Sequence, residues 1–262
     1  MIINSREQER LEKKLRHYTG KAIADFNMIE PGDRVLICLS GGKDSFTMLS
    51  VLKTLQLRTN KKFELFVFNL KQESSSWCDV PLREFLAKEA MPYEIVTRDI
   101  ASIVKAKIKV GAGHCSLCAR LRRGVIYQYA KEHNFNKIAL GHHRDDLIQT
   151  LLMSVFYSGA VKAMPPKLLT DDKKHIVIRP LVYCQEKDIA RYAKLKEFPV
   201  VTCNMYCTQR GTRRENTAKL IETLARENPK IPSNILHALG SIHPSQMMDH
   251  DLWDFKGLKI QL

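Results

Sequence analysis

The chain has 262 residues, enough for one enlarged domain or one domain with extensions, and 44% of them are hydrophobic against 27% charged. No apolar run approaches the roughly 20 residues that cross a bilayer, and residues 1–16 are too charged for a secretory signal, so we expect a cytoplasmic protein without membrane contact. The net charge of +14 favours a polyanionic partner, although a basic composition that only serves solubility would look the same.

Strand-like and helical patterns alternate along the first 157 residues. We expect helices at residues 5–28, 46–57, 80–90, 117–133 and 145–157, and strands at 35–39, 63–70, 93–96 and 138–141. This alternation predicts an α/β fold of the Rossmann-like kind, with a parallel sheet covered on both faces. Ligands of such sheets bind at the carboxyl ends of the strands.

The pattern loosens after residue 157. We expect a stiff turn at residues 164–167, a short strand at 175–180, a loop at 203–211, and helices at 186–196 and 215–227. The chain is therefore predicted to have three parts. These are a helical N-terminal extension (1–30), a central α/β domain (31–211) and a helical C-terminal tail (212–262).

The segment Ser40-Gly41-Gly42-Lys43-Asp44-Ser45 joins the first predicted strand to a helix. A glycine turn at a helix N-terminus presents backbone N–H groups and a positive dipole end, which suits a phosphate. Its lysine adds a positive charge, its serines add hydroxyl donors, and its aspartate offers an oxygen ligand to a Mg²⁺ that the phosphates share. An ordinary glycine turn is the alternative, but the whole hexapeptide predicts a pyrophosphate site.

These six residues resemble the SGGxDS signature of the PP-loop ATP pyrophosphatase superfamily. The resemblance implies that the chain binds ATP and cleaves it between the α and β phosphates, activating a carbonyl-like oxygen as its adenylate. Together with the positive net charge, an adenylating motif makes RNA the leading partner.

A second polar segment, Gly141-His142-His143-Arg144-Asp145-Asp146, follows the fourth predicted strand. Because the carboxyl ends of parallel strands share one sheet edge, we expect this segment near residues 40–45. Asp145 and Asp146 can cap the next helix, hold Mg²⁺ or position a nucleotide, and we expect a structural role for one and a functional role for the other. His142 is assigned to nucleotide binding.

Cys115 and Cys118 form a C-x-x-C motif at the start of a predicted helix. Such a pair can be redox-active, or it can bind zinc or an iron–sulfur cluster together with distant ligands. Cys203 and Cys207 are the distant thiols available, and spacing alone does not separate iron from zinc. The basic run that follows includes Arg122, which suits an anionic cluster, a phosphate or an RNA backbone.

Four segments together resemble the tRNA 2-thiocytidine synthetase family, which thiolates cytidine 32 of the anticodon loop. They are residues 40–45, 115–124, 139–146 and 164–181. The resemblance implies a fold of the adenine nucleotide alpha hydrolase (PP-loop) type, ATP and Mg²⁺ as ligands, and three cysteines that hold a 4Fe-4S cluster. One iron is then free to carry sulfur from a cysteine desulfurase. The implied catalytic residues are Asp44, Arg122, Asp145 and Asp146.

The chain departs from the family at two places. Cys115 and Cys118 match two cluster ligands, but the third lies in a stretch with one extra residue between its cysteines, so we assign Cys207 and keep Cys203 as the alternative. An acidic residue that the family carries after the second strand is absent, because Asn69 leads into Leu70 and Lys71 here. A divergent paralogue would show such departures.

The implied reaction starts with attack of the cytidine O2 on the α-phosphorus of ATP, which releases pyrophosphate and leaves an O-adenylate. Sulfide carried by the cluster then displaces AMP. A thiouridine synthetase or lysine ligase of the PP-loop type is one alternative, and a zinc-stabilised RNA-binding protein without catalysis is another. The sequence leaves open which tRNAs are modified and whether the chain forms a homodimer.

Overall fold

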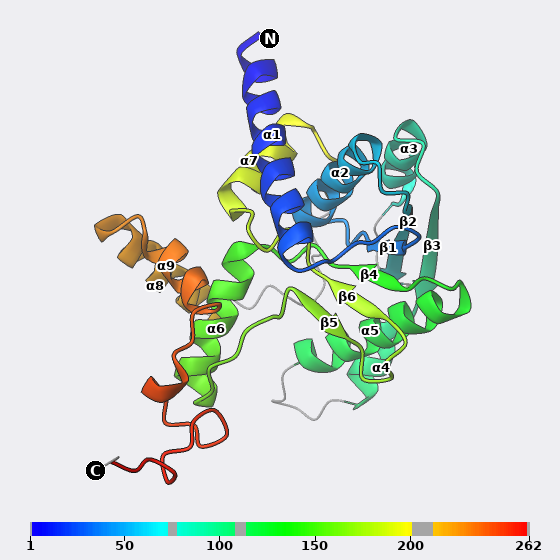
Figure 1. Cartoon of the computed structure of the whole chain (residues 1–262). Helices are drawn as coiled ribbons and strands as arrows, with labels where there is room; N and C mark the ends of the chain where they lie inside the picture. Colours follow the sequence, from blue (N-terminus) through cyan, green and yellow to red (C-terminus); the bar gives the residue numbers. More distant parts are fainter. Residues whose placement is uncertain (1, 73–77, 108–113, 201–211, 261–262) are drawn as a thin grey trace. The chain divides into compact units, whose positions relative to one another are not determined.

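A six-stranded sheet forms the centre of the computed structural model, which describes residues 2–72, 78–107, 114–200 and 212–260 (Figure 1). In chain order the strands are β1 (Arg34–Cys38), β2 (Glu64–Gln72), β3 (Tyr93–Arg98), β4 (Lys137–Ala139), β5 (Lys167–Leu169) and β6 (Ile176–Ile178). The spatial order is β3-β2-β1-β4-β6-β5, and all neighbours are parallel except β5 and β6. The predicted α/β class with a mostly parallel sheet is confirmed.

Helices precede, separate and follow the strands along the chain. They are α1 (Ile2–Asp25), α2 (Lys43–Arg58), α3 (Val80–Lys88), α4 (Ile100–Lys107), α5 (His114–Glu132), α6 (Arg144–Ser158), α7 (Glu186–Leu195), α8 (Arg213–Glu227) and α9 (Ile231–Ala238). The helices α1, α2 and α7 pack against one another on one side of the sheet, while α4 and α5 pack together on the other (Figure 1). The predicted alternation of strands and helices up to residue 157 is confirmed.

The core is divided by the sheet into two apolar layers. On the face that α5 covers, Tyr129 and Ala130 of this helix pack on Leu36 of β1 and Phe68 of β2. On the other face, the Phe46 ring of α2 lies 5.1 Å from the ring of Phe85 in α3, measured between centroids. Each large side chain buried in this way contributes about 1.5–3 kcal/mol, so both layers hold the strand ends in fixed positions.

Two helices and one strand of the structure are not predicted from the sequence. The strand β5 begins inside the predicted turn at residues 164–167, and α4 and α9 fall in segments for which no helix is predicted. The β5 strand has three residues, and Leu168 and Leu169 are both exposed, so no alternation of apolar and polar residues marks it. Its antiparallel pairing with β6 decides its conformation.

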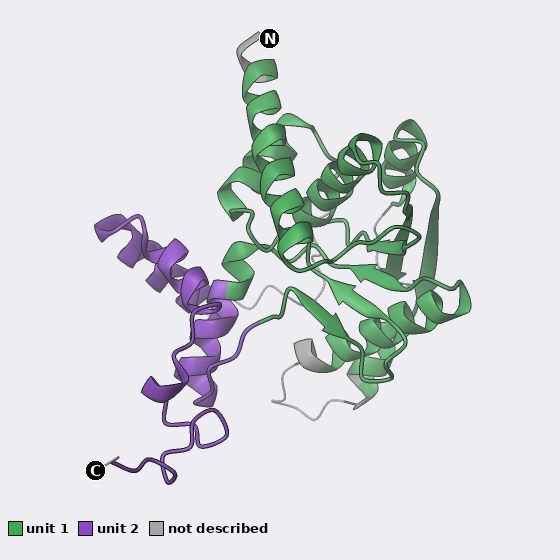
Figure 2. Cartoon of the chain, in the orientation of Figure 1, with its two compact units in different colours: residues 1–147, 164–212 green, residues 148–163, 213–262 purple. Residues whose placement is uncertain are grey.

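Two compact units make up the chain (Figure 2). Unit 1 comprises residues 1–147 and 164–212 and includes α1 and the whole sheet. Unit 2 comprises residues 148–163 and 213–262 and includes most of α6 with α8 and α9. The domain boundaries placed near residues 30 and 211 remain predictions. Within the described ranges, no helix combines the length and the hydropathy of a membrane span.

Candidate active site

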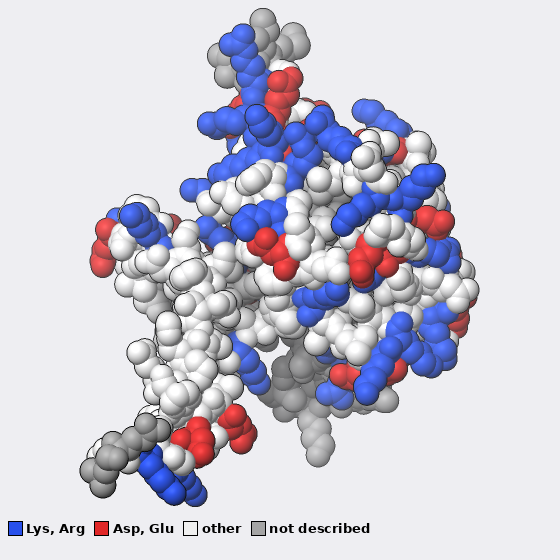
Figure 3. All heavy atoms as spheres, viewed as in Figure 1, with Lys and Arg blue, Asp and Glu red and all other residues white. Residues whose placement is uncertain are grey.

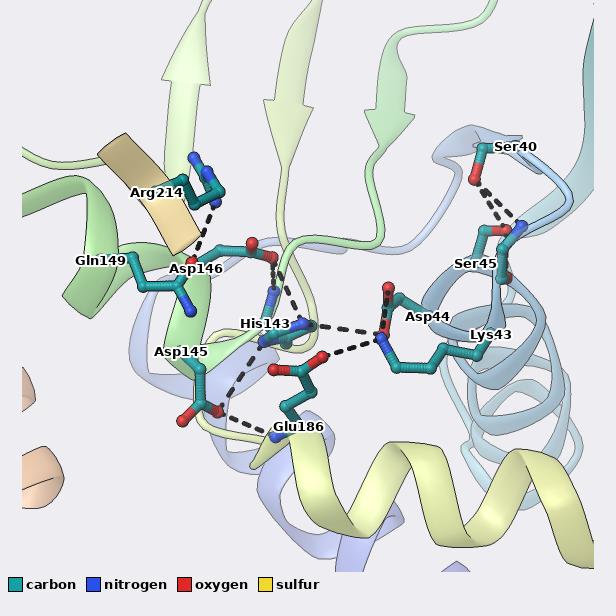
Figure 4. A network of polar contacts seen from close by, with 11 residues as sticks. Ser40, Lys43, Asp44, Ser45, His143, Asp145, Asp146, Gln149, Glu186 and Arg214 are labelled. Carbon is teal, nitrogen blue, oxygen red and sulfur yellow. Dashed lines mark hydrogen bonds and ion pairs between the residues drawn. The ribbon is translucent and has the colours of Figure 1, made fainter. Parts of the chain in front are cut away.

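The turn between β1 and α2 has the form expected of a phosphate-binding loop. Gly41 has a φ of +86°, a value that residues with a Cβ rarely adopt, and no side chain caps the helix at Gly42. Ser45 Oγ donates a hydrogen bond of 2.9 Å to the Gly42 carbonyl, and Ser40 Oγ lies 3.2 Å from Ser45 Oγ. The hydroxyls and the helix N-terminus therefore surround the same short turn (Figure 4).

The segment after β4 lies directly against this turn. β1 and β4 are neighbours in the sheet, so their carboxyl ends are adjacent. A Cβ added at Gly141 would lie 3.1 Å from the backbone nitrogen of Ser45 and 3.2 Å from the carbonyl carbon of Asp44. The approach of the two loops thus requires glycine at this position. The prediction that residues 141–146 lie near residues 40–45 is confirmed.

A buried histidine lies among three carboxylates at this junction (Figure 4). His143 is only 4% exposed, and its Nε2 is 3.7 Å from Asp44 Oδ1 and 3.5 Å from Asp146 Oδ2. Its Nδ1 is 3.8 Å from Asp145 Oδ2. Asp146 Oδ2 also accepts a hydrogen bond of 3.1 Å from the backbone N–H of His143, which is a capping contact in the first turn of α6.

Glu186, the first residue of α7, connects the two loops. Its side chain lies 3.1 Å from Lys43 Nζ, and its backbone N–H donates a hydrogen bond of 2.8 Å to Asp145 Oδ2. Lys43 Nζ is also 3.1 Å from Asp44 Oδ1. Burial by itself would lower the pKa of Lys43, but these two carboxylates outweigh it and raise the pKa above its ordinary value. Lys43 therefore carries a positive charge beside the phosphate turn.

Buried polar atoms without a hydrogen-bond partner gather at the carboxyl edge of the sheet. They include Asp44 Oδ1 after β1, Asn69 Oδ1 within β2, His143 Nδ1 and Arg144 Nε after β4, and Arg179 Nε after β6. Asn69 is 3% exposed, and its Nδ2 donates to the Leu39 carbonyl at 2.7 Å, which leaves the amide oxygen as the unpaired atom. Native structures leave few such atoms unpaired, so this edge is suited to a polar ligand.

Comparison with known proteins identifies the family. A model described as a PP-loop domain matches residues 8–213. A tRNA-cytidine(32) 2-sulfurtransferase from Legionella pneumophila (strain Paris) is 60% identical over 249 residues, which cover 95% of this chain and 88% of the relative. The chain belongs to the tRNA-cytidine(32) 2-sulfurtransferase family. A member from Coxiella burnetii (strain RSA 493) is 56% identical and covers 97% of this chain and 99% of its own length.

Membership in the tRNA-cytidine(32) 2-sulfurtransferase family confirms the predicted resemblance and makes the chain an enzyme. Among solved structures, the U34-tRNA thiolase NcsA from Methanococcus maripaludis with its 4Fe-4S cluster has a TM-score of 0.72 to this chain. It covers 90% of this chain and 81% of its own, at 20% identity. This likeness confirms the fold of the PP-loop type.

Of the four cysteines considered as cluster ligands, two belong to α5 and two fall outside the described residues. Cys118 is half-buried in the first turns of α5, and the backbone of Cys115 belongs to the same helix. Cys203 and Cys207 fall outside the described residues. Cys184, by contrast, is buried, and burial raises the pKa of its thiol to about 11, so it stays protonated and acts as a small apolar side chain.

The residues around the turn fit a Mg²⁺ that is shared with a nucleotide. Among the described residues, no group of three or more His, Cys, Asp or Glu side chains is arranged to hold a metal ion. Mg²⁺ needs no such group, because it commonly binds one or two carboxylates together with substrate phosphates. Asp44 Oδ1 is a buried oxygen that has ion-pair contacts with Lys43 and His143 but no hydrogen bond, which suits one of these carboxylates.

Two residues of this site are not among those predicted from sequence. The ring among the carboxylates is that of His143, whereas its half-buried neighbour His142 is the one assigned to the nucleotide. Glu186 has no motif around it, and the only signal is its place at the start of a predicted helix. Arg122 is exposed on α5, and among the described residues no hydrogen bond or ion pair joins it to the phosphate turn.

Proposed function

We propose that the chain catalyses the ATP-dependent 2-thiolation of cytidine 32 in tRNA, through an O-adenylate and with sulfur delivered by a 4Fe-4S cluster. The observation that carries the proposal is the group of buried polar atoms without a hydrogen bond beside the glycine turn, at the carboxyl edge of the sheet. Such atoms gain hydrogen bonds when a nucleotide and a polar base bind there. The family supplies the identity of the substrate.

The turn at residues 40–45 would bind the pyrophosphate part of ATP. Lys43 offsets the charge of the phosphates, and Asp44, with Asp145 as a second carboxylate, would hold Mg²⁺ against them. The cytidine O2 then attacks the α-phosphorus, and the bond to the bridging oxygen breaks, so that pyrophosphate leaves and the base carries AMP. His143 keeps the carboxylates in place, and Glu186 pairs with Lys43 until a phosphate takes over that contact.

Adenylation turns a poor leaving group into a good one. Sulfide forms a bond to C2 of the base and the C2–O bond breaks with the departure of AMP, so the substitution has no net transfer of electrons. When bound by Cys115, Cys118 and Cys207, the cluster would supply an iron site that carries sulfide. A cysteine desulfurase would provide the sulfur as a persulfide, and a thiol reductant would supply the two electrons that release it as sulfide. The tRNA is held by the positive charge of the chain.

The test begins with protein purified without oxygen, in which iron, acid-labile sulfide and zinc are measured. We expect about four irons and four sulfides per chain, as a 4Fe-4S cluster requires. Cys118→Ala should abolish formation of 2-thiocytidine in tRNA and leave ATP binding unchanged. The matched control is Cys78→Ala, which removes an exposed thiol. Zinc without sulfide, or joint loss of thiolation and ATP binding, would contradict the proposal.

A further inference from the structure

The last turn of α6, in unit 2, exposes two adjacent aromatic rings. Phe156 is 53% exposed and Tyr157 is 45% exposed, and their neighbours Val155 and Ser158 are exposed as well. Large aromatic side chains contribute most to stability when they are buried, so two consecutive exposed rings on a regular helix contribute little to the fold. Their exposure points to a partner that covers them.

A guanidinium group lies over one of these rings. Arg213, the first residue of α8, has its Cζ 4.8 Å from the centroid of the Tyr157 ring. Thr217 Oγ1 donates a hydrogen bond of 2.8 Å to the Arg213 carbonyl, which secures the start of α8. Both residues belong to the same compact unit as the rings. The two rings lie edge-to-face with centroids 6.4 Å apart, and together with the guanidinium they form a cluster that we call the aromatic platform (Phe156, Tyr157 and Arg213).

The charge around the aromatic platform permits an anionic partner. Residues 148–163 contain one cation, Lys162, and no acidic residue. In Figure 3 the visible face of unit 2 carries few charged side chains, whereas many blue side chains lie on the visible face of unit 1. Nothing acidic in the last turns of α6 would therefore repel a phosphate that follows a base onto the rings.

We propose that the aromatic platform stacks an unpaired base of the tRNA, an inference that rests on the proposed function. Proteins that bind single-stranded loops hold unstacked bases on aromatic rings and on planar arginine side chains. A protein partner fits this surface less well, because burying the Arg213 guanidinium in an apolar interface would remove its water without pairing its charge. Next to a base and its phosphate the same group is paired.

The experiment measures the affinity of the complete, anaerobically purified protein for an unmodified tRNA transcript with cytidine at position 32. Tyr157→Leu and Phe156→Leu keep the apolar bulk and remove the ring, and each should weaken binding about tenfold. Tyr157→Phe should bind as wild type. Val155→Ala, an exposed but non-aromatic change in the same turn, is the control that should leave the affinity unchanged. The dependence of the affinity on salt should keep its slope, since no phosphate contact is lost.

Unchanged tRNA affinity in both leucine variants would overturn the inference. A change of oligomeric state in light scattering that accompanies the weaker binding would also overturn it, and would make the surface an interface between proteins. The thermal midpoint and ATP binding of each variant check that it is folded. Failure of the wild-type protein to thiolate tRNA would count against the proposed function, whereas thiolation by the wild type with unaffected variants would count only against the platform.

Discussion

The two edges of the central sheet differ in how completely their buried polar atoms are hydrogen-bonded. At the amino edge, Asp33 accepts hydrogen bonds of 2.7 Å from the Glu30 N–H and from Asn136 Nδ2, and it lies 3.6 Å from Lys137 Nζ. Among the described residues of that edge, one nitrogen of His175 is the buried polar atom left without a partner. At the carboxyl edge several buried polar atoms have no hydrogen bond, among them Asn69 Oδ1, Arg144 Nε and Arg179 Nε.

The contrast indicates that the amino edge contributes to the stability of the sheet, whereas the carboxyl edge is arranged for ligand binding. A buried polar atom without a partner costs about 1–3 kcal/mol, so the carboxyl edge lowers the stability of the ligand-free chain. At the amino edge charges and amides satisfy one another except at His175, so the cost there is smaller. We infer that ligand binding supplies the missing partners, and the following substitutions test whether the two edges can be changed independently.

Asp44→Asn is expected to have the largest effect. It removes the negative charge assigned to Mg²⁺ and to the orientation of Lys43, so ATP-dependent release of pyrophosphate should fall about 10²- to 10³-fold. Asp44 pairs with Lys43 where the two side chains are 29% and 31% exposed, so the lost ion pair should cost about 1 kcal/mol or less and the thermal midpoint should change little. The control is Asp79→Asn, which removes a carboxylate of similar exposure that pairs with Lys71 before α3. Full activity in the Asp44 variant would remove this residue from the mechanism.

Asp33→Ala should show the reverse pattern. It leaves the Lys137 ammonium, whose side chain is 3% exposed, with only the more distant and half-exposed Glu30, which we expect to cost about 3 kcal/mol of unfolding free energy. The KM for ATP should not change. Glu64→Gln, which breaks an exposed ion pair with Arg34 at the same edge, should cost about 1 kcal/mol or less in urea unfolding. Equal losses in the two variants would show that the Asp33 pair behaves like a surface pair.

Gly141→Ala tests the contact between the two loops. The new methyl group would lie 3.1 Å from Ser45 N and would push the loops apart by a few tenths of an ångström. We expect kcat/KM to fall by about tenfold, less than the roughly 10²-fold that a 1 Å misplacement costs. Gly124→Ala is the matched control, because nothing lies within 4 Å of its added Cβ on α5. It should raise the unfolding free energy by about 0.5–1 kcal/mol and leave turnover unchanged. If both variants kept full turnover, the close approach would have no catalytic consequence.

Glu186→Gln should have the smallest effect. The side chain of Glu186 is 47% exposed, so its attraction for Lys43 is screened by water. Removing its charge frees Lys43 for phosphate, and the Kd for pyrophosphate should fall by about fivefold or less. Lys187→Gln, an exposed change at the next position, provides the control in the same calorimetric titration. Weaker pyrophosphate binding in the Glu186 variant would mean that this residue holds Lys43 in its productive position.

Several features of the chain follow from local sequence. The alternation of apolar runs with helical patterns predicts the sheet, and the hexapeptide at residues 40–45 predicts the turn, because a glycine pair between a strand and a helix specifies its own backbone. The four family-like segments predict the family. The short β5 strand is not predicted from the sequence, because three residues carry no periodicity and only the pairing with β6 makes this segment a strand.

Tertiary packing alone decided which side chains meet. Lys43 and Glu186 are far apart in the chain, and the packing of α7 on α2 brings them within 3.1 Å. The exposure of Phe156 and Tyr157 is likewise invisible in an apolar helical stretch, which by pattern predicts burial. Sequence determines local conformation because φ and ψ preferences act between near neighbours, whereas partners and exposure depend on what the folded chain places opposite each side chain.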